Sequence, residues 1–83
     1  MLSFRHSLHF HIRSEGSLIE DEEGLDLSDL DRAKAEAIAG ARDIIADRAL
    51  SGEPASLNDV FEVTGESGEI LLTIPFTEAV PRN

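Results

Sequence analysis

The stretch L-H-F-H-I-R, residues 8–13, decides the fold class of this 83-residue chain. Apolar and polar residues alternate strictly along it, in the order Leu8, His9, Phe10, His11, Ile12 and Arg13. A period of two is typical of a β-strand that buries one face and exposes the other. We therefore predict a half-buried strand, with the apolar residues facing a core and both histidines on the solvated face.

The residues that follow this stretch predict a hairpin. Residues 14–17 (S-E-G-S) are typical of a turn in which Gly16 adopts a positive φ angle. Residues 17–20 (S-L-I-E) predict a short second strand. Residues 8–20 should therefore form an antiparallel β-hairpin.

Residues 29–50 predict one amphipathic helix. The stripe at helical spacing is apolar and rich in alanine: Leu30, Ala33, Ala37, Ile38, Ala41, Ile44 and Ile45. The alanines would let the helix axis approach a sheet closely. We expect Ser28 to cap the N-terminal end, and Pro54 to prevent continuation beyond Gly52.

Residues 60–76 predict two further strands around the turn G-E-S-G. The residues expected to face inward are Phe61, Val63, Ile70, Leu72 and Ile74, and Leu71 is expected on the solvated face. The order β-β-α-β-β predicts an α+β fold, in which two hairpins form a single antiparallel sheet covered on one face by the helix. Residues 1–83 should form one domain, with residues 1–6 and 78–83 as loosely held tails.

Composition narrows the classes of partner. Seventeen acidic residues against seven basic ones give a formal net charge of −10. Such a chain repels nucleic-acid phosphates and anionic membrane surfaces, so we expect neither as a partner.

The sequence contains no cysteine, which excludes disulfides and thiolate chemistry within it. No stretch has the apolar length of a signal peptide or a transmembrane helix, and we expect a cytoplasmic protein.

The two histidines also raise the hypothesis of a metal site. His9 and His11 lie two residues apart on a predicted strand, so both project from the same face and could supply two zinc ligands. A third ligand would have to come from His6 or Glu62. The outward positions of a sheet with one solvated face take polar residues without any metal, and we expect none here.

Residues 20–31 contain seven acids and no base. The run does not fit an EF-hand calcium loop, because Leu25 or Leu30 would occupy the fifth position in the two registers considered. No serine lies in a G-x-S-x-G context, and residues 65–68 lead into a predicted strand rather than a phosphate-binding helix. The sequence therefore predicts a charged surface, no catalytic residues, no cofactor and no enzymatic activity.

Four stretches together resemble a bacterial, mostly alphaproteobacterial, domain-of-unknown-function family of short proteins. They are F-H-I-R (residues 10–13), D-E-E-G (21–24), D-L-D-R-A-K-A-E-A (29–37) and the closing run 61–76. The resemblance spans residues 8–77 and implies the same order of elements with no assigned activity. His11 and Asp21 match residue types frequent in that family, whereas Gly65 replaces a more usual acid. The strand, acidic loop and helix alone are similar to HicB-like antitoxin domains.

Two hypotheses of function follow. The first is a small non-enzymatic interaction module that forms a homodimer, because the core is small and aliphatic and Leu71 is expected at the surface. The second is an antitoxin-like partner of a basic protein, bound through the acids Glu20, Asp21, Glu22, Glu23 and Asp26. Salt screens exposed charges, so the dependence of binding on ionic strength separates the two. Metal binding at His9 and His11 is a third, weaker alternative.

Overall fold

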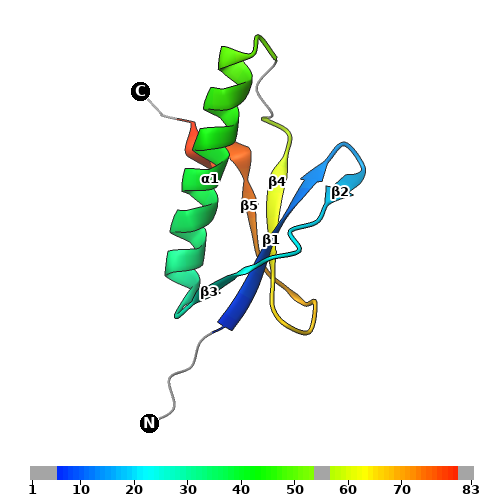
Figure 1. The fold of residues 1–83 in the computed structure, drawn as a ribbon, viewed down its shortest axis with the longest axis vertical. Coiled ribbons are helices and arrows are strands. Elements are labelled where there is room, and N and C mark those ends of the chain that lie inside the picture. The colour runs from blue at the N-terminus through cyan, green and yellow to red at the C-terminus, as the bar shows by residue number, and fades with distance from the viewer. Residues whose placement is uncertain (1–5, 54–56, 81–83) are drawn as a thin grey trace.

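The alternating stretch forms the central strand of an antiparallel sheet. The computed structural model describes residues 6–53 and 57–80, and in it β1 (His6–Ser14) pairs with three other strands. The strands β2 (Ser17–Ile19) and β3 (Leu25–Leu27) lie along one edge of β1, and β4 (Val60–Thr64) lies along the other. The last strand, β5 (Ile70–Pro75), pairs with β4 and forms the far edge of the sheet (Figure 1).

The predicted hairpin of β1 and β2 closes through a two-residue turn. Ser14 pairs with Ser17, and the residues between them, Glu15 and Gly16, have φ angles of 47° and 82°. Two positive φ angles characterise a type I′ turn, whose twist matches that of the two strands it joins.

Strand β3 is an element that the sequence did not predict. Leu25 pairs with Leu8, and Leu27 pairs with His6, so β3 extends the sheet beside the first residues of β1. The three residues L-D-L lie inside an acidic run and are too short to show a periodicity of their own. They pair as a strand because β1 begins at His6, two residues before the alternating stretch.

The predicted helix is α1 (Leu30–Leu50), and it packs against β5 and the short 3₁₀ helix η1 (Phe76–Ala79) (Figure 1). Its buried residues are the three predicted alanines, Ala33, Ala37 and Ala41. The N-cap is Asp29 rather than Ser28, because the Asp29 carboxylate accepts the Arg32 main-chain N–H at 2.8 Å. No helix in the described part of the chain is long and apolar enough to cross a membrane.

The core lies between α1 and the sheet. Its largest fully buried side chains are Phe76, Leu8 and Val63. Phe76 packs against Phe61 with ring centroids 5.0 Å apart. Ala79 is buried as well, so the ordered fold extends beyond residue 78, where the sequence predicted a loose tail. Of the predicted tails, residues 1–5 and 81–83 lie outside the described residues.

The pairing of β4 with β5 corrects the predicted orientation of Ile70. The register shifts by one between Val63 and Thr64, so Val63 pairs with Leu72 while Thr64 pairs with Ile70. Leu71 is the additional residue of this bulge. Ile70, expected in the core, is 57% exposed. Leu71, expected at the surface, is 39% exposed and also lines an apolar cavity beside α1.

Candidate functional site

The two histidines of β1 lie on the face predicted for them, but they are not simply solvated. Both residues are half-buried, and their rings stack with centroids 5.9 Å apart and planes 7° from parallel. The segment that joins β2 to β3 passes beside them. This segment, residues 20–24, we call the acidic bridge.

The acidic bridge fills a gap in the strand pairing of β1. On this edge, β3 pairs with β1 as far as Leu8, and pairing with β2 resumes at Ile12. Three residues of β1, 9–11, therefore face five residues of the bridge instead of a strand. Main-chain groups at a gap of this kind need other hydrogen-bond partners.

Asp21 bonds to β1 through both its main chain and its side chain. Its main-chain N–H donates to Nδ1 of His11 at 3.0 Å, and its carbonyl oxygen accepts from Nδ1 of His9 at 2.8 Å. Its Oδ2 accepts the Phe10 main-chain N–H at 3.0 Å. Asp21 thus replaces a strand residue in the gap of the sheet.

The other carboxylate oxygen of Asp21 closes the turn of the bridge. Its Oδ1 accepts the main-chain N–H groups of Glu23 and Gly24, each at 3.2 Å. Partial burial opposes the charge on this carboxylate and raises its pKa. The N–H groups of Phe10, Gly24 and Glu23, helped by His9, outweigh burial, and the net result is a pKa below the ordinary value for aspartate.

Gly24 is required by both its conformation and its surroundings. Its φ angle is 74°, a region that residues with a Cβ rarely adopt. A Cβ added at this position would lie 3.0 Å from Cε1 of His9 and 3.1 Å from the carbonyl oxygen of Leu8. The D-E-E-G motif therefore combines one inward-facing aspartate with a glycine that lets the bridge approach β1.

The hydrogen bonds of His11 fix the position of its proton. Nδ1 accepts from Asp21, so the proton of the neutral ring is on Nε2, which donates to Oγ1 of Thr64 at 3.1 Å. A histidine that activates a hydroxyl nucleophile must instead accept the hydroxyl proton. In this arrangement the pair does not activate Thr64, and it links β1, β4 and the acidic bridge.

Metal ligation would compete with the same hydrogen bonds. Both Nδ1 atoms bind the main chain of Asp21, and Nε2 of His11 binds Thr64. Glu62, one of the possible third ligands, pairs with Arg13, whose Nε lies 3.2 Å from Oε2 of Glu62. Within residues 6–53 and 57–80, no three histidine or acidic residues are arranged to hold a metal ion.

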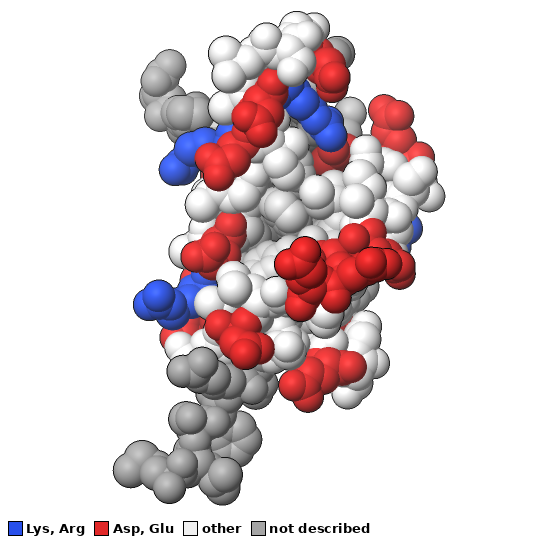
Figure 2. Space-filling view, in the orientation of Figure 1, with Lys and Arg blue, Asp and Glu red and all other residues white. Residues whose placement is uncertain are grey.

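The histidines, the bridge and the β4–β5 turn surround an open polar cavity of about 360 Å³. Its lining residues are His9, His11, Glu20, Asp21, Glu22, Thr64, Gly65, Glu66 and Gly68. Figure 2 shows acidic side chains gathered over the segment between β2 and β3. Apart from the histidines, the charged side chains of this cavity are all acidic, and the site would repel an anionic ligand.

A family model described as Domain of unknown function (DUF6894) matches residues 8–77. The chain belongs to this family. The match spans the whole sheet except the first two residues of β1, together with α1 and the start of η1. No curated protein and no solved structure matches the chain.

The acids predicted as an interaction surface fall into two groups in this DUF6894 domain. Glu20, Glu22, Glu23 and Asp26 are exposed, and Asp26 accepts a hydrogen bond from the hydroxyl of Ser7 at 3.1 Å. Asp21 differs, because its carboxylate faces the main chain of β1 and the bridge. Its structural role was not predicted from the sequence; the signal for it was Gly24, three residues later, which allows a tight turn over the aspartate.

Proposed function

We propose that this chain is a small, acidic, non-enzymatic protein-interaction module that forms a homodimer through strand β5. The observation that carries the proposal is the unequal protection of the two sheet edges. An edge strand presents unpaired N–H and C=O groups, and proteins protect such edges with short strands and charges. The structure places β5 at one edge with nothing but β4 paired to it among the described strands.

The opposite edge has both kinds of protection. There β2 and β3 are three residues long each, and the acidic bridge separates them. In contrast, β5 has six residues, I-L-L-T-I-P, and no charge. Ile70, at its start, is 57% exposed. The uncharged, apolar strand is therefore the edge suited to pairing with another chain.

A second copy of the chain is the occupant that fits this edge. Two β5 strands related by a two-fold axis pair antiparallel, and each supplies the partner groups that the other lacks. Pro75 has no N–H to donate, so it limits the pairing at the C-terminal end of the strand. The net charge of −10 opposes association of two copies, and salt should therefore strengthen the dimer by screening the repulsion.

Light scattering behind a sizing column tests this proposal at micromolar concentration. The dimer has twice the 9.0 kDa mass of the chain. Ile70→Lys should give the monomer, because a charge on an edge strand disfavours its pairing with another chain. Ile19→Lys is the matched control, since Ile19 is 53% exposed on the opposite edge, and it should leave the dimer intact. A monomeric mass for the unmodified chain at all salt concentrations would refute the proposal.

A second proposal is an antitoxin-like role, in which the chain neutralises a basic protein. The exposure of Glu20, Glu22, Glu23 and Asp26 favours it. Binding of this kind should weaken as salt rises, the opposite of the response expected for the dimer. Zinc binding by His9 and His11 is the weakest proposal, because it requires His11 to give up its hydrogen bond to Asp21 or to Thr64. The absence of cysteine supports a cytoplasmic setting, and the family resemblance supports a bacterial one.

A further inference from the structure

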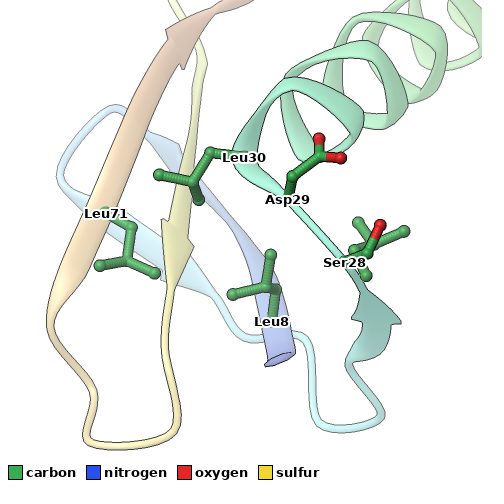
Figure 3. Close-up of a pocket in the computed structure, with 6 residues that line it drawn as sticks. Leu8, Ser28, Asp29, Leu30 and Leu71 are labelled. Carbon is green, nitrogen blue, oxygen red and sulfur yellow. The ribbon is translucent and has the colours of Figure 1, made fainter. Parts of the chain in front are cut away.

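An apolar cavity opens at the end of the sheet where α1 begins. It has a volume of about 270 Å³, and its lining residues are Leu8, Leu27, Ser28, Asp29, Leu30 and Leu71. Figure 3 shows the side chains of Leu8, Leu30 and Leu71 converging on it from β1, α1 and β5. A cavity of about 150 Å³ lined by apolar side chains holds a benzene molecule. This one therefore has room for a leucine or phenylalanine side chain.

A second cavity of about 150 Å³ continues the first toward the β4–β5 turn. The two share Leu8 and Leu71, and the second also contacts Glu66 and Glu69. We call the two together the leucine groove. The charged residues that line it are Asp29, Glu66 and Glu69, with no lysine or arginine among its described lining residues. Arg32 lines a third cavity, which shares Leu27 and Ser28 with the first.

The charges of the groove decide what chemistry fits it. The first cavity is largely apolar, and the charged residues that line the second, Glu66 and Glu69, are both acidic. The start of α1 does not offer an anion site, because the Asp29 carboxylate already accepts the Arg32 N–H. A fatty acid or an acidic peptide would meet repulsion, whereas a chain with lysines or arginines beside an apolar side chain would meet complementary charge.

We propose that the leucine groove binds a basic amphipathic peptide segment of a partner protein. An apolar side chain of the partner enters the cavity between Leu8, Leu30 and Leu71, and flanking basic residues pair with Glu66 and Glu69. The groove lies on the α1 side of the sheet and contains neither Ile70 nor the acidic bridge. The inference therefore goes beyond self-association and does not depend on it.

The test uses the full chain, labelled with ¹⁵N, and two synthetic 12-residue peptides. One alternates pairs of lysine and leucine, and the other has the same charge with serine in place of leucine. We expect the lysine–leucine peptide to bind at least tenfold more tightly, with amide shifts concentrated at Leu8, Leu27, Leu30 and residues 65–71. Equal affinity of the two peptides, or shifts spread along the outer face of α1, would refute the groove.

Matched variants test the same inference at single residues. Leu30→Glu should weaken binding of the lysine–leucine peptide at least tenfold, and it suits a helix start, where acids are favourable. Leu50→Glu is the control at the other end of α1, where Leu50 is 88% exposed.

A second pair of variants tests the charge of the groove. Glu66→Lys should weaken binding of the lysine–leucine peptide more than Glu36→Lys, which lies on the outer face of α1. Equal effects within each pair would indicate nonspecific attraction to the acidic surface and would overturn the proposal. Shifts of the same amides on dilution without peptide would assign the groove to a second copy and overturn it too.

Discussion

The main-chain N–H of Asp21 donates to Nδ1 of His11 over 3.0 Å, so a side chain of the central strand holds the segment that links β2 to β3. The same aspartate accepts the main-chain N–H of Phe10. Asp21 and β1 therefore donate to each other. Moving the bridge away would leave both sets of polar groups unpaired, which costs free energy when they are shielded from water. This relationship explains why the histidines are hydrogen-bonded although they lie on the outward face.

The first prediction concerns the Asp21 side chain. Asp21→Ala removes the acceptor for three main-chain N–H groups, those of Phe10, Glu23 and Gly24. We expect a loss of about 1–3 kcal/mol in the free energy of unfolding, measured by urea denaturation. Glu22→Ala, at the exposed neighbouring position, should change stability by less than about 0.5 kcal/mol. Equal losses in the two variants would contradict the role assigned to Asp21.

The lowered pKa of Asp21 predicts how this contribution depends on pH. Burial raises the pKa, but the three main-chain N–H groups and His9 together lower it by more, so the folded value lies below the unfolded one. The ionised carboxylate therefore stabilises the fold fully above its ordinary pKa of about 3.9, and the stabilisation is lost as the pH falls through the folded value. The difference in stability between the unmodified chain and Asp21→Ala should be constant from pH 7 to 5. It should then shrink at lower pH, and a difference that grows on acidification would show the opposite linkage.

Gly24→Ala tests the close approach of the bridge to β1. The new Cβ would lie 3.1 Å from the Leu8 carbonyl oxygen in a residue whose φ angle is 74°. Gly52→Ala is the control, because Gly52 has a φ angle of 76° and no atom within 4 Å of the added Cβ. Backbone strain should cost about 1–2 kcal/mol in both variants. The additional loss in Gly24→Ala measures the contact with His9 and Leu8, and thermal unfolding of the two proteins would reveal it.

Local patterns in the sequence were sufficient to predict most elements of the fold. The alternation through Leu8, Phe10 and Ile12 predicted β1, and the stripe of Ala33, Ala37 and Ala41 predicted the buried face of α1. Both depend on the spacing of neighbouring residues along one element. The N-cap was predicted one residue too early, because Ser28 and Asp29 have equally suitable side chains and only the structure selects Asp29.

Features that depend on distant pairing could not be predicted in this way. Ile70 is exposed instead of buried because the bulge opposite Thr64 shifts the register by one residue. A shift of one residue reverses the face of the side chains on one side of the bulge, whereas Leu72 and Ile74, on its other side, keep their predicted contact with the core. The role of Asp21 depends likewise on distant pairing, because Asp21 fills the gap that β2 and β3 leave along the edge of β1. In the sequence, nothing distinguishes Asp21 from the exposed acidic residues beside it.

The packing of α1 provides a matched pair of substitutions. Ala41 is fully buried against the core, whereas Ala39, two residues earlier, is exposed. Ala41→Leu should overpack the space and lower the free energy of unfolding by about 1–3 kcal/mol. Ala39→Leu should change it little, since leucine and alanine both favour helix. Equal melting temperatures for the two variants would mean that the helix buries a different face.

The last prediction concerns zinc and the histidines of β1. Stoichiometric Zn²⁺ should leave the melting temperature unchanged, because ligation by both rings would break a hydrogen bond of His11, either to Asp21 or to Thr64. A true site at 100 times its dissociation constant would instead add about 2.7 kcal/mol to the free energy of unfolding. His9→Ala and His11→Ala supply the controls. A zinc-dependent gain that disappears in both variants would show that both rings bind the metal and that His11 gives up a hydrogen bond to do so.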